Sequence, residues 1–393
     1  MSLNNILPTV TDKELTHLIK NLKNYKYFKQ QTIKELKTYF PNSSFLFFDS
    51  ARSSLKFLAE TVLNKQSKIA LQCFTCSAVI HPFLTSQVRP VYLSFDFDSF
   101  NFEIKHLLEK KSSEIKAVLI QYTFGITPKT LHKIISFCRK NNILIIEDLS
   151  HSFGNKVNKQ FLGNLGDFAV ISFGKDKVIN CSTGGCLVIN NQNYSRLLKE
   201  KFHYIPEITF QKKLQQFFYL FFMQFAKKYY GFKLTRGLIF LLQSIGLLQK
   251  SVSNREKQLK QEDIYRFNKY LFPLLYTQIK KLKSNSSERW QNTQYWNHIF
   301  SKNYNTSLLK FPISVRNKKE ILKELQQKKI FLSTWYANLI DPADIDLSKY
   351  QINLDNFIKE KKFAEHIINL PTFNLSKQQA SIIYSILKKY EGY

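Results

Sequence analysis

The sequence predicts an α/β protein with a mostly parallel sheet flanked by helices, followed by a smaller C-terminal α+β domain. Short apolar runs rich in β-forming residues alternate with helix-like stretches between residues 40 and 190. Continuous apolar strands that alternate with helices are typical of a parallel sheet covered on both faces. The more charged C-terminal part contains one further strand-like run followed by a helix-like run. The chain of 393 residues is long enough for two or three domains with a sizeable core.

The expected strands are short runs dominated by aliphatic and aromatic residues, at 45–48, 68–71, 91–95, 117–121, 143–147, 168–172 and 186–190. The expected helices lie between several of these runs, at 52–63, 77–85, 102–110 and 129–140. In the last helix, Leu131, Ile134, Ile135 and Cys138 recur at helical spacing. Ligands bind beyond the carboxyl ends of the strands in such sheets, so the loops after the strands are the first places to look for function.

Composition divides the chain into an N-terminal arm with the large domain, an apolar and basic helical insertion, and a small C-terminal domain, at 1–205, 206–262 and 263–393. The small domain is expected to contain a strand and two helices, at 307–315, 318–327 and 377–389.

The insertion contains two aromatic and aliphatic runs, 214–226 and 237–248, with basic residues on both sides of each. Each run is shorter than the roughly 20 apolar residues that a bilayer crossing needs. Such helices can lie in a membrane interface, which would place the protein at the inner face of the membrane. They can equally form a hairpin that is buried against the rest of the protein or against a second subunit.

The chain is strongly basic, with 58 Lys and Arg against 29 Asp and Glu and a net charge of +29. Such a charge attracts phosphates, nucleotides, nucleic acid or an anionic membrane, although a general compositional bias explains it equally well. No nucleic-acid-binding motif is present, so nucleic acid is not expected as a partner. Residues 1–20 lack the apolar core of a signal peptide, which predicts a cytoplasmic location. Cys73 and Cys76 have no second ligand pair, so they are expected to pack as small apolar residues and no metal is expected.

Asp148 is the first candidate for chemistry, because it stands at the end of the apolar run 143–147. Burying an unpaired carboxylate is costly, so this position requires a reason. A helix cap or a salt bridge would supply one. A cationic ring nitrogen would supply another, since a pyridoxal cofactor needs an aspartate to keep its ring protonated. His151, three residues later, is placed to reach the ring oxygen or to stack on the ring, although a lone histidine is more often structural.

The second candidate is the segment Ser172-Phe-Gly-Lys-Asp-Lys177, which follows the strand at 168–171. A lysine forms a Schiff base only if its amine loses its proton part of the time, which burial or a neighbouring cation promotes. Ser172 is placed to bond a phosphate, and Gly184 with Gly185 permits a tight turn. The alternative is that Lys175 and Lys177 are surface lysines of a lysine-rich chain.

The third candidate is the turn Asp49-Ser-Ala-Arg-Ser-Ser54, between the first strand and an apolar-periodic helix. Backbone N–H groups at a helix N-terminus suit a phosphate. An ordinary Ser or Asp helix cap is the alternative, since the turn lacks a glycine.

Taken in chain order, the turn at 49–54, Asp148 and the segment 172–177 resemble the corresponding segments of the DegT/DnrJ/StrS sugar aminotransferases. These are fold-type-I enzymes dependent on pyridoxal phosphate. The resemblance is strongest over residues 40–192. The matching segments are 49–55, Gln121-Tyr-Thr-Phe-Gly125, Glu147-Asp-Leu-Ser-His151, the glycines of 154–167, Ser172 to Lys177, and Leu370-Pro-Thr372.

The resemblance implies a set of residues that bind pyridoxal 5'-phosphate, namely Ala51, Arg52, Ser53, Phe74, Asp148, His151, Ser172 and Lys177. Lys177 would hold the cofactor as a Schiff base and then act as general base and acid, and Asp148 would keep the ring nitrogen protonated. Residues 51–53 and Ser172 would bind the phosphate, and Phe74 or His151 would stack on the ring.

The resemblance also implies a transaminase that moves an amino group, from glutamate in most relatives, to a nucleotide-linked keto sugar. Such enzymes act in cell-surface polysaccharide or related sugar biosynthesis, as homodimers with active sites at the interface. Two features depart from the family pattern: Ala51 replaces the usual glycine, and the insertion replaces the segment through which the partner subunit reaches the phosphate.

An inactive, membrane-associated scaffold of the same fold is therefore the alternative, and the retention of both Asp148 and Lys177 favours the enzyme. Lys177 also argues against the related sugar dehydratases, which have histidine at this position.

Overall fold

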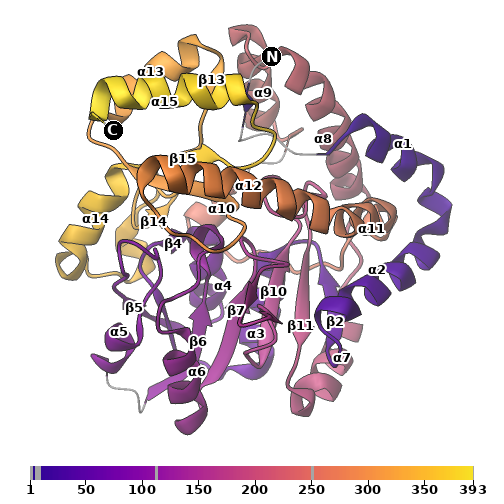
Figure 1. Ribbon diagram of the computed structural model, residues 1–393. Coiled ribbons are helices and arrows are strands. Elements are labelled where there is room, and N and C mark those ends of the chain that lie inside the picture. The colour runs from indigo at the N-terminus through magenta and orange to yellow at the C-terminus, as the bar shows by residue number, and fades with distance from the viewer. Residues whose placement is uncertain (1–2, 5–9, 111–113, 249–251, 393) are drawn as a thin grey trace.

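The computed structural model of the protein describes residues 3–4, 10–110, 114–248 and 252–392. Residues 249–251 of the predicted insertion lie outside this part, as do most of the first nine residues, on which the predicted location partly depends. In Figure 1 the strands of the central sheet lie in the lower half, and the C-terminal helices and strands lie above them. The predicted fold class is confirmed.

Seven strands form the central sheet, in the order β2-β11-β10-β7-β6-β3-β5. Their bounds are β2 (Ser44–Phe48), β3 (Lys68–Gln72), β5 (Arg89–Leu93), β6 (Ile115–Ile120), β7 (Leu144–Asp148), β10 (Phe168–Ser172) and β11 (Gly185–Ile189). Only β11 runs antiparallel to its neighbours in this sheet. Helices cover the sheet on both faces, which is why its strands are apolar without alternation.

The helices of this region are α3 (Ala51–Val62), α4 (Ser77–Thr85), α5 (Ile104–Leu108), α6 (Leu131–Lys140) and α7 (Ser195–His203). The predicted apolar stripe of α6 is buried, as its helical spacing requires. Three short strands lie in the loops, namely β4 (Thr75–Cys76), β8 (Lys156–Val157) and β9 (Gln160–Phe161).

Two N-terminal helices, α1 (Asp12–Lys20) and α2 (Tyr25–Tyr39), lie at the right of Figure 1 and pack against α11 (Phe272–Lys280). Thr11 caps α1 reciprocally with Glu14, a pairing that fixes where this helix begins. Glu14 also bonds Gln278 of α11, at 2.9 Å, so the N-terminal arm is tied to the part of the chain that follows the insertion.

The C-terminal part contains the helices α12 (Leu282–Phe300), α13 (Lys318–Gln327), α14 (Ile358–Glu365) and α15 (Lys377–Glu391). Its strands are β12 (Lys310–Ser314), β13 (Ile330–Phe331), β14 (Ile340–Asp341) and β15 (Ile367–Pro371). Strand β12 pairs with β15, β14 pairs with β4, and β13 pairs with β1 (Leu3–Asn4). The C-terminal part is therefore joined to the large domain by strand pairing. The boundaries predicted at 205 and 262 stay predictions.

The insertion forms α8 (Phe210–Tyr229), α9 (Lys233–Ser244) and the short α10 (Asn254–Lys257). Lys227 Nζ and Gln224 Nε2 both donate to the Val10 carbonyl, at 2.6 and 2.8 Å. No helix within the described ranges is long and apolar enough to cross a membrane.

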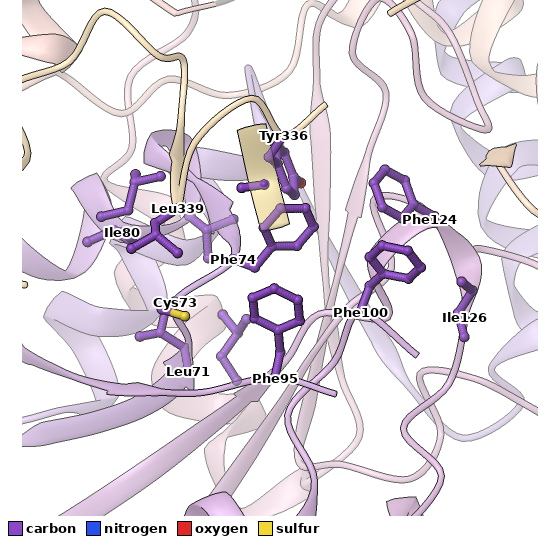
Figure 2. Packing of buried hydrophobic residues seen from close by; sticks show 14 of the residues in the cluster. Leu71, Cys73, Phe74, Ile80, Phe95, Phe100, Phe124, Ile126, Tyr336 and Leu339 are labelled. Atoms are coloured by element: carbon purple, nitrogen blue, oxygen red, sulfur yellow. The ribbon is translucent and has the colours of Figure 1, made fainter. Parts of the chain in front are cut away.

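An aromatic cluster joins the sheet to the C-terminal part. In Figure 2, Phe74 lies between Phe95 and Tyr336, with Phe100 and Phe124 beside them. The Phe74 ring centroid lies 4.8 Å from that of Phe95 and 5.1 Å from that of Tyr336. All five side chains are buried, so the cluster fixes the segment that carries Tyr336 against the sheet.

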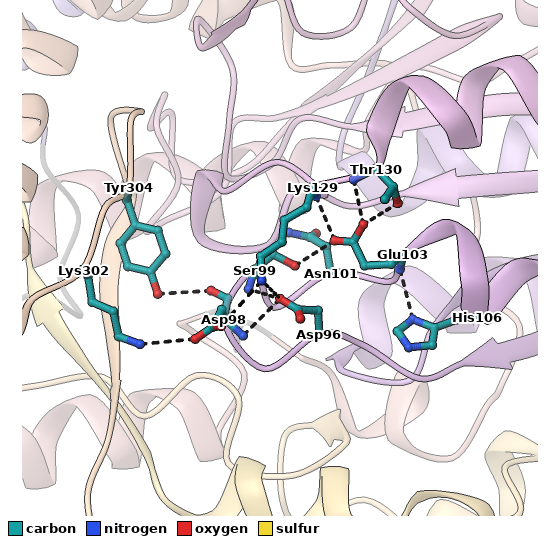
Figure 3. A network of polar contacts seen from close by, with 10 residues as sticks. All are labelled: Asp96, Asp98, Ser99, Asn101, Glu103, His106, Lys129, Thr130, Lys302 and Tyr304. Carbon is teal, nitrogen blue, oxygen red and sulfur yellow. Dashed lines mark hydrogen bonds and ion pairs between the residues drawn. The ribbon is translucent and has the colours of Figure 1, made fainter.

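A polar network holds the loop that follows β6 (Figure 3). Glu103 accepts hydrogen bonds from the backbone N–H groups of Lys129 and Thr130, at 2.8 and 2.7 Å. Asn101 accepts from the Thr123 N–H at 3.0 Å and donates to the Ile126 carbonyl at 3.0 Å. The network therefore fixes the turn at Thr123–Gly125, which reaches the site described below.

Candidate active site

A cavity of about 440 Å³ lies at the carboxyl ends of the parallel strands. This is within the usual size range of small-molecule sites. The residues that line it come from the strand ends, the start of α3, the loop after β10, the insertion and the segment before β14. Those used below are Ala51, Arg52, Gln121, Asp148, His151, Ser172, Lys175, Lys177, Thr183, Gly184, Tyr219, Met223, Ile239, Trp335 and Tyr336.

Lys177 and His151 meet inside the cavity, with the lysine Nζ 3.1 Å from the histidine Nε2. The Phe124 N–H donates to His151 Nδ1 at 3.1 Å. A neutral imidazole whose Nδ1 accepts a hydrogen bond carries its proton on Nε2. Burial lowers the pKa of His151 well below its ordinary value, and the charges of Lys177 and Lys310 act in the same direction. The Nε2–H of a neutral ring therefore faces the lysine nitrogen and suits an amine with a free lone pair.

An unusual turn orients this histidine. Tyr122 and Phe124 both have positive φ angles, 49° and 59°, a conformation that residues other than glycine seldom adopt. The turn aims the Phe124 N–H at His151, while the polar network of Figure 3 holds the backbone on either side. Local strain of this kind persists where the surroundings determine it, often at functional sites.

Asp148 and Glu147 are neighbours in β7 but have different surroundings. Glu147 is fully buried and accepts four hydrogen bonds, from the Tyr122 hydroxyl and from the N–H groups of Gly163, Leu165 and Gly166. Asp148 lines the cavity and accepts from the Ser150 N–H at 2.9 Å. Burial raises the pKa of Asp148, while its hydrogen bonds to Ser150 and the charge of Lys177 oppose that rise. Glu147 thus holds the glycine-rich loop, and of these two neighbours Asp148 is the one available to a ligand.

The start of α3 also lines the cavity. Ala51, Arg52, Ser172 and Thr183 line it here, so backbone N–H groups and hydroxyls converge where a phosphate would be held. Ala51 is the first helical residue and is not among the described residues with a positive φ. The alanine that replaces the family's usual glycine therefore fits this turn.

Ser53 does not line the cavity. Its N–H donates to the Ser50 hydroxyl at 3.1 Å, and its own hydroxyl donates to Asp49 at 2.6 Å. The Ser53 hydroxyl is thus used to cap the helix, and the role of Ser53 in binding a phosphate stays a prediction.

Arg52 is fixed by the insertion. Its guanidinium pairs with Glu256, a fully buried residue that follows α9 in the chain. Ser77 also donates to Glu256, at 3.4 Å. The ion pair fixes the Arg52 side chain at the cavity wall, and it connects the start of α3 to the insertion.

Phe74 does not reach the cavity either, because it is completely buried in the aromatic cluster of Figure 2. Strand β4 begins at the next residue and pairs with β14, which turns Phe74 toward the core. The stacking of Phe74 on a cofactor ring stays a prediction, and this placement does not support it. Of the two predicted aromatic residues, only His151 lines the cavity.

Trp335 and Tyr336 line the cavity as well, and the sequence had not indicated them. The Trp335 ring is stacked parallel to His151, with centroids 5.6 Å apart and planes 9° apart. Lys177 Nζ lies 4.6 Å from the centre of the Trp335 ring. Gln121 donates to the Tyr336 hydroxyl at 3.3 Å. Only the aromatic pair itself could have marked these residues, since the stretch 330–340 is apolar for the most part.

Lys175 is a second lysine in the cavity wall. Its Nζ lies 4.2 Å from the centre of the Tyr219 ring on α8. Burial lowers the pKa of Lys175 to about 8. A lysine with this property is a candidate for amine chemistry in its own right, so the roles of Lys175 and Lys177 must be separated by experiment.

Gly185 sets the distance between β11 and the start of α3. A Cβ at this position would lie 2.4 Å from the Ala51 backbone nitrogen. We therefore expect Gly185→Ala to lower the free energy of unfolding by about 2 kcal/mol, because the strand and the helix must move apart. Denaturant unfolding measures this change.

Gly237→Ala is the matched control, since a Cβ there meets no atom of the described residues within 4 Å. Gly237 lies inside α9, where alanine is the better helix former. Equal stability of the two variants would contradict the assigned role of Gly185.

The donors of the cavity fit pyridoxal phosphate. Its lining includes a helix N-terminus with neighbouring hydroxyl groups, a buried aspartate, and a lysine beside a neutral histidine. Together with the mostly parallel sheet, they define the class of fold-type-I, pyridoxal-phosphate-dependent transferases.

Comparison with known proteins identifies the family within this class. The profile of the DegT/DnrJ/EryC1/StrS aminotransferase family matches residues 19–221, just over half of the chain. The chain belongs to this family, whose cofactor is pyridoxal phosphate.

Curated relatives match at low identity. A UDP-4-amino-4,6-dideoxy-N-acetyl-beta-L-altrosamine transaminase of Campylobacter jejuni is 25% identical over 266 residues, 67% of this chain and 59% of the relative. A GDP-perosamine synthase of Escherichia coli O157:H7 is 23% identical over 140 residues, 35% of this chain and 38% of the relative. The chain thus matches less than two thirds of the length of these relatives.

Solved structures resemble the whole chain in fold. Helicobacter pylori PseC, an aminotransferase involved in the biosynthesis of pseudoaminic acid, superposes with a TM-score of 0.71 at 18% identity and 100% coverage of both chains. The PLP form of Spr1654 from Streptococcus pneumoniae has a TM-score of 0.73 at 15% identity, over 100% of this chain and 99% of that one.

Proposed function

We propose that the protein is a pyridoxal-phosphate-dependent aminotransferase that transfers an amino group to a keto sugar, in cell-surface polysaccharide or related sugar biosynthesis. The observation that carries the proposal is the cavity in which Lys177 faces a neutral His151 beside the buried Asp148. An inactive scaffold would not need to keep these three groups together. Sugar dehydratases are also among the relatives, and the lysine at 177 supports the transaminase rather than that reaction.

When bound, pyridoxal phosphate supplies a protonated ring that accepts electrons from the carbon next to an amino group. The residues of this chain would bind it and move the protons. The Asp148 carboxylate would hold the ring nitrogen, and Ala51 N–H with the Ser172 hydroxyl would hold the phosphate. Lys177 Nζ would move a proton from the donor carbon to the cofactor carbon, and in the opposite direction for the acceptor, as general base and acid. His151 would keep this nitrogen oriented through its Nε2–H.

The proposed acceptor is a keto sugar linked to a nucleotide. Relatives named for GDP-linked, UDP-linked and dTDP-linked sugars support this choice. The excess of basic residues suits a diphosphate group. The proposed amino donor is glutamate, by resemblance to the family.

We propose a homodimer by the same resemblance, and a cytoplasmic location, where nucleotide-linked sugars are made. Tyr219 and Met223 of α8 line the cavity from within this chain. They therefore supply part of the wall without a partner subunit.

The first test is the visible absorbance of the purified protein with pyridoxal phosphate, before and after glutamate. We expect a yellow band that glutamate removes and that an added keto acid restores, because transamination of the cofactor is reversible. A protein that stays colourless with excess cofactor would contradict the proposal and favour the scaffold.

A further inference from the structure

The insertion exposes an apolar surface that nothing in the described part covers. We define it as the outer face of α8 and α9. Thirteen of the 22 large apolar side chains that are exposed among the described residues lie between 210 and 247, so exposure is concentrated on this hairpin. Examples are Phe210 (74% exposed), Phe225 (56%), Phe240 (71%) and Ile245 (60%). Apolar side chains that gather on one surface in this way mark an interaction site.

Helix α8 is apolar on two sides. Its inner stripe, which includes Tyr219, Leu220 and Met223, is buried against the protein. Its outer stripe recurs at helical spacing, at Phe218, Phe221 and Phe225, and is exposed. A helix that is apolar all round is normally buried on all sides. The outer stripe therefore requires a second apolar environment.

Helix α9 extends the exposed apolar surface of α8. Among its twelve residues none is buried, although the run Leu238 to Leu242 is entirely aliphatic or aromatic. In Figure 1 the two helices stand at the upper edge of the molecule, away from the sheet. The outer face is thus accessible in the isolated chain.

The charge of the hairpin indicates what covers it. Residues 210–247 contain six Lys and Arg and no Asp or Glu. Within the described part of the chain, none of these six forms an ion pair, and Lys228 and Lys233 are exposed. A second copy docked on the same face would bring like charges together. Anionic lipid headgroups complement the basic residues while the apolar side chains enter the interface.

We propose that the outer face of α8 and α9 docks the protein on an anionic lipid surface. The helices lie on the surface rather than crossing it, in agreement with the absence of a spanning helix among the described residues. Tyr219 and Ile239, on the other side of the same hairpin, line the cavity. Docking thus brings the cavity to within about one helix diameter, roughly 10 Å, of the lipid. The proposal does not depend on catalytic activity.

Flotation of the full chain with vesicles tests this proposal. We expect the protein to float with vesicles of phosphatidylcholine and phosphatidylglycerol at about 2:1, and to float about tenfold less with phosphatidylcholine alone or in high salt. Phe225→Ser with Phe240→Ser, and separately Lys228→Glu with Lys233→Glu, should each lower the bound fraction about tenfold or more.

Matched controls change the same residue classes on other exposed surfaces. These are Tyr27→Ser with Ile358→Ser, and Lys29→Glu with Lys133→Glu. They should float like the unchanged protein. Circular dichroism of every variant shows that loss of flotation is not loss of folding.

Three outcomes would overturn the proposal. The first is no flotation with anionic vesicles at low salt. The second is an equal loss in the control pairs. The third is self-association, measured by sedimentation, that the hairpin variants abolish in a protein that does not float. That last result would assign the outer face to a second copy of the chain.

Discussion

Lys177→Ala is expected to abolish the glutamate-dependent loss of visible absorbance and to lower turnover by about 10³-fold or more. The reason is positional. Lys177 Nζ is the amine that His151 Nε2 faces at 3.1 Å, within the cavity that also contains Asp148. Steady-state rates and absorbance spectra of the purified variant, with cofactor in excess, measure both effects.

Lys175→Ala is the matched control, since this lysine lies two residues away and also lines the cavity. Its contact is with the Tyr219 ring of α8, so we expect this variant to keep the visible band and to change mainly the KM of the sugar. The opposite pattern, with the band lost in Lys175→Ala and kept in Lys177→Ala, would transfer the catalytic role to Lys175.

Asp148→Asn is expected to lower turnover by roughly 10²-fold or more while the protein stays folded. The amide keeps the size of the side chain but removes the negative charge that would hold a protonated ring nitrogen. Because the variant no longer has to bury a charged carboxylate, its free energy of unfolding should not fall. Rates and thermal unfolding of the same preparation test both statements.

Glu147→Gln provides the contrast within the same strand. Glu147 accepts hydrogen bonds from the backbone N–H groups of Gly163, Leu165 and Gly166. We therefore expect Glu147→Gln to lower the melting temperature more than it lowers turnover. An Asp148→Asn variant with the turnover of the unchanged protein would contradict a role for Asp148 in the mechanism.

The order of elements in the large domain could be predicted because each strand there is a short apolar run buried on both faces. Strand β10 begins and ends where the sequence indicates, and so does α4. Most of the other predicted elements are displaced by one or two residues, as β5 is, which was expected at 91–95 and is found at Arg89–Leu93. Because β5 is an edge strand, Pro90 can lie within it without breaking a central ladder.

The position of four cavity residues could also be predicted, since Asp148, His151, Ser172 and Lys177 lie at strand ends or in the loops that follow them, and all line the cavity. Trp335 could not. It lies in a loop more than 150 residues after Lys177, without periodicity, and it reaches the site only because β14 pairs with β4. The burial of Phe74 in the aromatic cluster could not be predicted, because the sequence does not show which way a residue before a two-residue strand will turn.

The two adjacent carboxylates of β7 have a consequence for how the sheet assembles. Successive residues of a strand point to opposite faces, so a slip of one position would exchange Glu147 with Asp148. Such a slipped strand would leave the glycine-rich loop without its acceptor. The four hydrogen bonds that Glu147 accepts therefore favour the native register of β7. In that register Asp148 faces the cavity.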